Sequence, residues 1–110
     1  MLEPLLVMTN VPDAELAVTM ATCLVEQGLA ACVNILPPVK SVYRWQGKVE
    51  HATELSLLIK TTSVRYAELQ AAIISMHPYE VPEIIAIPVT AGLPAYLNWI
   101  EAETVKVLNA

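Results

Sequence analysis

The chain has 110 residues, a formal net charge of −5 and a hydrophobic content of 55%. The length predicts a single domain over residues 1–110, and so much apolar sequence in a short chain predicts a subunit interface beside the core. The acidic balance, without any Lys/Arg cluster, argues against nucleic acid and anionic membranes as partners, and no apolar run approaches the ~18 residues of a membrane span.

The chain begins with a pattern that predicts a strand and then a helix. Leu5–Thr9 is a short apolar run of the kind that forms interior strands. A helix is predicted to start near Pro12, where proline fits the first turn, and to end near Gly28, where a left-handed cap is expected. The core face of this helix repeats every four residues, at Leu16, Met20 and Leu24.

The middle of the chain predicts two antiparallel strands. One strand region runs over residues 31–43, in which Pro37 and Pro38 mark a bulge or an edge because proline donates no ladder hydrogen bond. A hairpin turn follows at residues 44–48, with a positive φ expected at Gly47. In the return strand polar residues alternate with apolar ones at Leu55, Leu57 and Ile59.

The last third predicts a helix, a strand and a further helix. Pro78 ends the second helix, whose core stripe consists of Tyr66, Leu69, Ile73 and Met76. The fourth strand covers Ile84–Val89, where Pro88 indicates an edge position or the strand's end. The third helix opens at Gly92 and Pro94, and one of its faces carries Leu97, Ile100, Thr104 and Leu108.

The order β-α-β-β-α-β-α matches, in its first six elements, the split β-α-β pattern of ferredoxin-like folds. We therefore predict an α+β fold, a βαββαβ sandwich with an added C-terminal helix. In this topology the end of the first strand (residues 8–10), the hairpin turn (45–47) and the segment 77–83 share one end of the sheet. Any binding site is expected there, and the hairpin can reach beyond its own sheet to a neighbouring subunit.

The sequence also bears on compartment and catalysis. Met1–Pro4 has no basic n-region, and Cys23 and Cys32 lack CxxC spacing, so we predict a cytosolic protein with reduced, buried thiols. No enzyme is predicted, because the chain has no HExxH motif and no Gly-rich phosphate loop. Both cysteines lie in apolar patterns that disfavour a thiolate.

Five segments together resemble one protein family: "LAACVNI" (29–35), "SVYRWQGKVE" (41–50), "LLIKTT" (57–62), "HPYEVPEI" (77–84) and "YLNWI" (96–100). In order and spacing they resemble the CutA divalent-cation tolerance family over essentially the whole chain. The resemblance implies a tight homotrimer similar in shape to the PII nitrogen-signalling trimers. It also implies a role in divalent-metal tolerance, copper binding and no established reaction.

The resemblance further implies where copper would bind. Some bacterial members are assigned a site made of a cysteine late in the first strand and two successive histidines before the Pro-Tyr. Carried over position by position, these ligands fall on Met8, Met76 and His77. Thioether sulfur and imidazole both suit copper, and such a set would select Cu(I). The last carbonyls of the second helix would also favour a cation beside His77.

The residues themselves leave alternatives open at this end of the fold. His77 can bind metal with other partners or serve as a hydrogen-bonding residue at the helix end, and methionines on apolar faces commonly pack. Glu80 and Glu83 can be solvated, pair across an interface or ligate a hard metal, whereas His51 is expected to be solvated. Three aromatic residues can pack in a subunit interface or wall a ligand, namely Tyr43, Trp45 and Tyr79.

The leading hypothesis is a cytosolic, non-catalytic homotrimer that binds copper or another divalent cation. One alternative is a PII-like trimeric signalling protein with a small effector in the clefts between subunits. The other is a trimeric scaffold on which protein partners dock.

Overall fold

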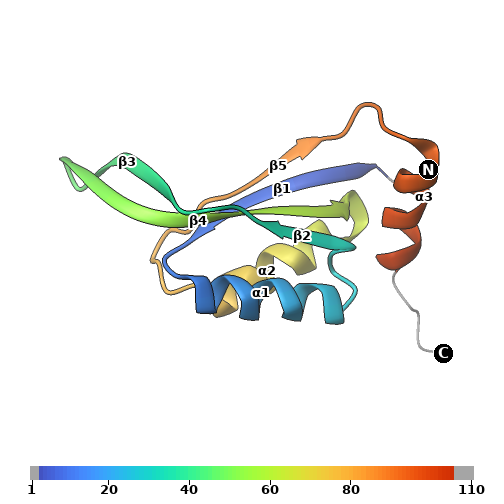
Figure 1. Cartoon of the computed structure of the whole chain (residues 1–110), viewed down its shortest axis with the longest axis horizontal. Coiled ribbons are helices and arrows are strands. Elements are labelled where there is room, and N and C mark those ends of the chain that lie inside the picture. The colour runs from blue at the N-terminus through green and yellow to red at the C-terminus, as the bar shows by residue number, and fades with distance from the viewer. Residues whose placement is uncertain (1–2, 106–110) are drawn as a thin grey trace.

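The computed structural model describes residues 3–105, and its elements follow the predicted order with one added strand (Figure 1). The strands are β1 (Pro4–Val11), β2 (Cys32–Ile35), β3 (Val39–Trp45), β4 (Lys48–Thr62) and β5 (Ile84–Pro88). The helices are α1 (Ala14–Glu26), α2 (Tyr66–Met76) and α3 (Pro94–Glu103), and a short 3-10 turn, Ser63–Arg65, precedes α2.

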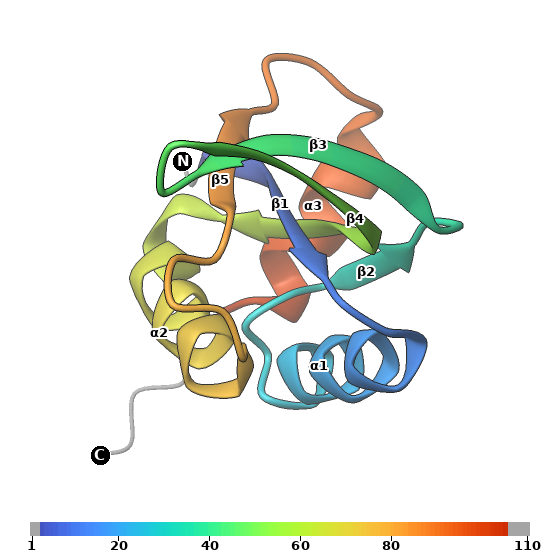
Figure 2. The ribbon, with the colours of Figure 1, turned by 90° about the vertical axis from the view of Figure 1, so that its left-hand side faces the viewer.

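The strands pair antiparallel in the order β2-β4-β1-β5, and β3 pairs with β4 beyond that path. Helices α1 and α2 lie side by side under one face of the sheet, while no helix crosses the centre of the other face (Figures 1 and 2). This is the predicted ferredoxin-like α+β sandwich with an extra C-terminal helix. Strand β5 lies at the sheet edge and ends at Pro88, as that proline predicted.

Strand β1 shows why the two faces of the sheet differ. Successive side chains of a strand point to opposite faces, and every second residue of β1 from Leu5 to Val11 is buried. This buried side faces the helices, where Met20, Leu24, Leu69 and Ile73 are fully buried in the same core. Burying a side chain of this size stabilises the fold by about 1.5–3 kcal/mol.

Local signals at both ends of α1 explain its length. Asp13 precedes the helix in extended conformation, and its Oδ1 accepts a hydrogen bond from the backbone N–H of Leu16 at 2.8 Å. Such a cap satisfies one of the free donors of the first turn. Gly28, just past the last turn, has a φ of +68°, the left-handed geometry that was predicted for it.

The strand region predicted over residues 31–43 is in fact two strands. Pro37 and Pro38 separate β2 from β3, because neither can donate a ladder hydrogen bond, and both strands pair with the single long β4. Gln46 and Gly47 form the two-residue turn to β4, with φ of 49° and 79°. Positive φ at both central residues is what a type I′ hairpin requires, and the hairpin projects from the body (Figure 1).

Helix α3 packs at the end of the molecule opposite the hairpin (Figure 1). Ile100 of α3 and Thr104, the residue that follows its last turn, are buried, as predicted, and the Thr104 and Thr62 hydroxyl oxygens lie 3.4 Å apart. Leu108, predicted for the same face, lies outside the described residues. None of the helices within residues 3–105 combines the length and the hydrophobicity that a membrane-spanning helix requires.

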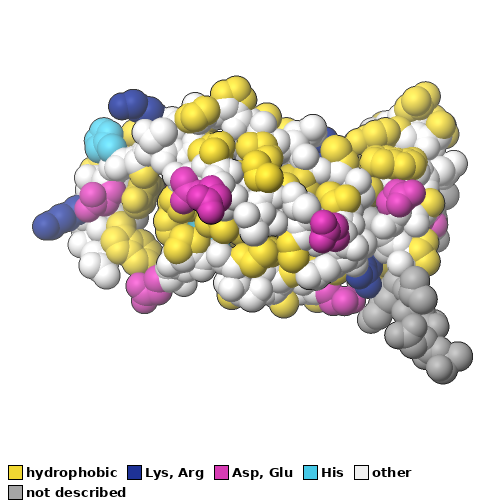
Figure 3. All heavy atoms as spheres, turned by 60° about the horizontal axis from the view of Figure 1, so that its bottom comes forward, with side chains coloured by type: hydrophobic (Ala, Val, Ile, Leu, Met, Phe, Trp, Pro, Cys, Tyr) yellow, Lys and Arg dark blue, Asp and Glu magenta, His cyan; other side chains and the backbone are white. Residues whose placement is uncertain are grey.

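The side of the molecule that carries α1 and α2 is a mixed surface. Figure 3 turns this side forward and shows hydrophobic, acidic and neutral polar side chains intermingled, with Lys and Arg side chains at separate positions. This face therefore offers no concentrated positive charge of the kind that binds a phosphate backbone.

Two adjacent isoleucines of α2 differ in burial, so their substitution tests which side of this helix packs in the core. Ile73 is fully buried and Ile74 is 52% exposed. We expect Ile73→Ala to lower the free energy of unfolding by about 2–5 kcal/mol, because it leaves a cavity in the core. Ile74→Ala makes the same chemical change at the surface and should shift it by no more than about 0.5 kcal/mol. Chemical denaturation measures both, and equal losses would contradict the orientation of α2.

Candidate functional site: a cavity at the hairpin end of the sheet

Three segments far apart in the sequence meet at one end of the sheet, as the topology predicted. The end of β1, the β3–β4 hairpin and the loop between α2 and β5 line one cavity of about 710 Å³. The Asn10 side chain accepts a hydrogen bond from Ser56 Oγ at 2.6 Å and donates one to Glu83 Oε1 at 3.4 Å. Asn10 therefore connects β1 to β4 and to the loop.

His77 joins the same network at the end of α2. It is 9% exposed, its Nε2 lies 2.7 Å from the Asn10 carbonyl oxygen, and its Nδ1 lies 3.2 Å from the backbone nitrogen of Tyr79. A carbonyl only accepts and an amide N–H only donates, so Nε2 carries the proton and Nδ1 accepts. The ring also packs on Tyr79, with centroids 4.6 Å apart. His77 thus acts as a hydrogen-bonding residue at the helix end.

The two methionines of the predicted copper set lie on different faces of the sheet. Met76 packs against the hydrophobic core on the helix side. Met8 alternates with the buried Val7 and Thr9 of β1. Its side chain therefore lies on the face of the sheet opposite α1 and α2, which we call the open face. The sheet separates the two thioethers, and a single chain does not bring Met8, Met76 and His77 together as one ligand set.

Other potential ligands do not complete a metal centre either. Among residues 3–105, no three His, Cys, Asp or Glu side chains come close enough to hold a metal ion together. Cys23 and Cys32 are free and half-buried, less enclosed than predicted, and His51 is exposed on the hairpin, as expected. Copper coordination by His77 stays a prediction, and it requires the ring to release the Tyr79 amide from Nδ1.

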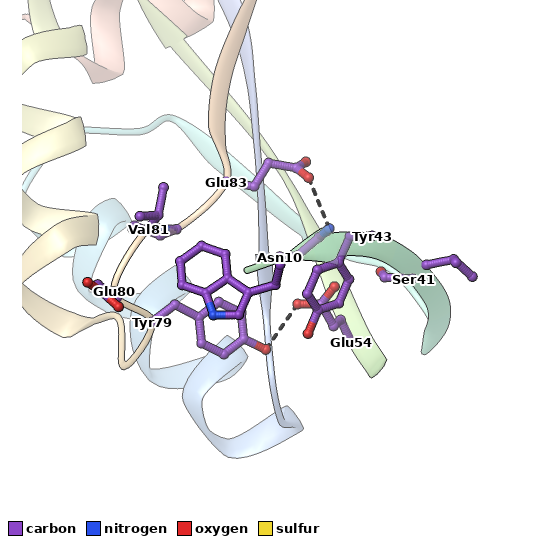
Figure 4. Close-up of a pocket in the computed structure, with 11 residues that line it drawn as sticks. Asn10, Ser41, Tyr43, Glu54, Tyr79, Glu80, Val81 and Glu83 are labelled. Carbon is purple, nitrogen blue, oxygen red and sulfur yellow. Dashed lines mark hydrogen bonds between the residues drawn. The ribbon is translucent and has the colours of Figure 1, made fainter. Parts of the chain in front are cut away.

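The walls of the cavity are aromatic and acidic (Figure 4). The three aromatic residues singled out in the sequence all line it, two from β3 and one from the loop: Tyr43, Trp45 and Tyr79. Three acidic residues line it as well, namely Glu54, Glu80 and Glu83, and no Lys or Arg is among its described lining residues. The cavity is therefore a negatively charged space with aromatic walls.

Tyr79 and Glu54 interact directly across this cavity. The Tyr79 hydroxyl donates to Glu54 Oε2 at 3.0 Å, and Glu54 is only 6% exposed. Partial burial, followed by the hydrogen bond to Glu54 and its negative charge, raises the pKa of Tyr79 to about 12. The phenol thus stays protonated at neutral pH and remains a donor to the carboxylate.

Glu54 is the site residue that the sequence pattern did not reveal. In the strand pattern it is only the polar neighbour of Leu55, and its partner Tyr79 lies 25 positions away. The bond between Asn10 and Glu83 spans 73 positions. One weak signal was present, since a carboxylate entering an otherwise buried strand needs a partner to offset its desolvation.

The fold and its end cavity define a small ferredoxin-like protein of the α+β class. Residues 5–103 match the sequence model of the family described as CutA1 divalent ion tolerance protein. The chain belongs to this family, which confirms the resemblance carried by its five segments.

Individual relatives and solved structures agree with this assignment. The divalent-cation tolerance protein CutA of Thermus thermophilus is 48% identical over 98 residues, which cover 89% of this chain and 95% of the relative. Protein CutA of Mus musculus is 43% identical over 90% of this chain, which spans only 56% of that longer protein. The solved Cut A1 structure from Thermus thermophilus matches with a TM-score of 0.91 at 46% identity, covering 93% of this chain and 99% of the other. CutA1 from Oryza sativa matches with a TM-score of 0.92 at 37% identity, covering 96% of each chain.

The contact between Tyr79 and Glu54 predicts a measurable titration. The difference in tyrosinate absorbance between the native protein and Tyr79→Phe isolates Tyr79, and we expect it to titrate near pH 12. In Glu54→Gln the pKa should fall but stay above 10.0, because partial burial remains. An unchanged pKa in Glu54→Gln would mean that the carboxylate does not hold the phenol.

The same pair predicts how stability depends on pH. The folded pKa of Tyr79 lies above the ordinary value of 10.0, so the folded state retains the proton more strongly than the unfolded state. Its contribution to stability is complete below about pH 10 and is lost as the pH rises towards about 12. Urea unfolding across this range should show a steeper loss in the native protein than in Tyr79→Phe, and parallel curves would contradict it.

Proposed function

We propose that this protein acts in divalent-cation tolerance as a cytosolic, non-catalytic homotrimer that binds copper. Membership of the CutA1 divalent ion tolerance family supports the first part of the proposal. The observation that carries the trimer is the open face of the sheet, which has no helix across its centre (Figure 2).

Apolar side chains form a strip across three strands of this open face. Met8 of β1 pairs with Leu58 of β4 and with Ile85 of β5. Ile85 is 49% exposed and its neighbour on the same face, Ile87, is 45% exposed. Scattered surface hydrophobics are ordinary, but a strip that runs from strand to strand favours burial against another subunit. Two further copies of this chain are the proposed occupants.

Copper binding by His77, with Met76 and Met8, is the more specific part of the proposal. The Nδ1 lone pair that a metal needs accepts from the Tyr79 amide at 3.2 Å, and leaving that partly buried N–H without an acceptor costs about 1–3 kcal/mol, which metal coordination would have to offset. Met76 directly precedes His77 in the chain, but its side chain packs against the hydrophobic core and would have to leave that packing to reach an ion held by His77. Met8 has the least support, because its side chain lies on the open face.

The cytosolic placement rests on Cys23 and Cys32, which are free thiols of the kind that persist in reducing compartments. The names of relatives indicate different compartments. The Archaeoglobus fulgidus structure is called a periplasmic divalent cation tolerance protein, and one Arabidopsis thaliana relative is called chloroplastic.

The trimer is tested by light scattering on the purified protein. The expected mass is about three times the 12.0 kDa of the chain. Ile85→Glu places a charge in the apolar strip and should lower this mass, because burying an unpaired carboxylate is costly. Val18→Glu, at a 56% exposed position on α1, is the matched control and should leave the mass unchanged. A monomeric native protein would overturn the proposed assembly.

Copper binding is tested by calorimetric titration with Cu(I) and Cu(II). We expect His77→Ala to weaken copper binding by at least about tenfold, because the metal would lose an imidazole ligand or a residue that orients its ligands. His51→Ala removes the other histidine, which is exposed on the hairpin, and should have no effect. Circular dichroism checks that both variants are folded. Indistinguishable curves for native protein and His77→Ala would remove His77 as a ligand.

A further inference from the structure

We propose that the cavity at the hairpin end binds a small organic cation, an alkylated or quaternary amine, between aromatic side chains and with Glu54 as its counter-ion. This site goes beyond the proposed copper binding and does not depend on it. The argument rests on the charge of the cavity, on the burial of Glu54 and on the chemistry of the walls.

The cavity concentrates negative charge without a compensating cation. Three acidic residues are among its lining residues, Glu54 from β4 and Glu80 and Glu83 from the loop. The Asn10 amide touches one of these carboxylates, Glu83, but adds no positive charge. Since no described Lys or Arg lines the space, a positively charged ligand is the chemistry that this cavity favours.

Glu54 is the strongest sign that a cation belongs here. The residue is 94% buried, since only 6% is exposed. Its hydrogen bond within the described chain comes from the neutral Tyr79 hydroxyl, and no ion pair with Lys or Arg forms there. A buried carboxylate that lacks a positive partner is costly. A ligand with a positive charge in the cavity would offset that cost.

The walls distinguish an organic cation from a metal ion. A metal needs several oxygen, nitrogen or sulfur ligands around one point, and no three suitable acidic, His or Cys side chains of residues 3–105 converge in that way. Aromatic rings do not ligate metals, but their faces attract diffuse, weakly hydrated cations. A cavity of about 710 Å³ is also of the size that holds a small organic molecule.

The aromatic side chains are placed to make such contacts. The Tyr79 hydroxyl from the loop reaches the Glu54 carboxylate, and Tyr43 from β3 lines the same cavity (Figure 4). Both tyrosines remain accessible, at 38% and 45% exposure, and Trp45 on the same strand is 38% exposed. A quaternary ammonium group here would meet aromatic faces and a carboxylate together, as in known sites for such ligands.

The test uses choline as the probe and dimethylbutanol, its uncharged carbon isostere, as the matched ligand. In a Trp99→Phe background the fluorescence reports Trp45 alone, because the chain has two tryptophans. We expect saturable quenching by choline, with the isostere binding at least about tenfold more weakly because it lacks the charge. Saturation-transfer NMR on the native protein measures the same affinities without the substitution.

Two glutamate variants locate the site. Glu54→Gln keeps an oxygen that can accept from Tyr79 but loses the charge, and should weaken choline binding about tenfold. Glu26→Gln makes the same change on an exposed turn of α1 and should leave it unchanged. Equal binding of choline and its isostere, no binding of choline, or full binding by Glu54→Gln would each overturn the proposal. If choline does not bind and Glu54→Gln lowers the oligomer mass, the cation is a side chain of a second copy instead.

Discussion

The length of β4 is the constraint on which the rest of this structure depends. Its 15 residues extend over about 46 Å, as 14 steps of ~3.3 Å, which is nearly the 48 Å that the molecule measures along its longest axis. Such a strand cannot stay within a core of this size. One half pairs with β1 and β2 and contributes Leu57 and Ile59 to the core, and the other half leaves the body as a hairpin with β3.

The site forms where β4 leaves the core. Glu54 is the first buried residue after the hairpin, and it stands next to the last pairs that β4 makes with β1. The loop after α2 reaches the same point because His77 holds the Asn10 carbonyl on one side and the Tyr79 amide on the other. Through these two hydrogen bonds His77 holds the loop against β1, which is a structural role. Any ligand role for His77 has to compete with this structural role.

Two surfaces with different chemistry follow from the same sheet. The open face is an apolar strip centred on Met8 and suits burial against other subunits. The end cavity is acidic and aromatic and suits a diffuse cation. They lie near each other because β1 carries Met8 on the open face and, two residues later, Asn10 at the cavity. Assembly through one surface would therefore influence access to the other.

The amino-acid sequence by itself determined the elements, the class of fold and the end of the sheet at which a site would form. These follow from spacings of two to four residues, from proline and glycine positions and from the handedness of the chain, all of which are local. The resemblance of its segments to the CutA family also implied Met8, Met76 and His77 as the copper ligands. Only the tertiary structure decided that the sheet separates the two methionines and that Glu54 is buried beside Tyr79. Those outcomes depend on strand register and on contacts across 25 to 73 positions, which no local pattern encodes.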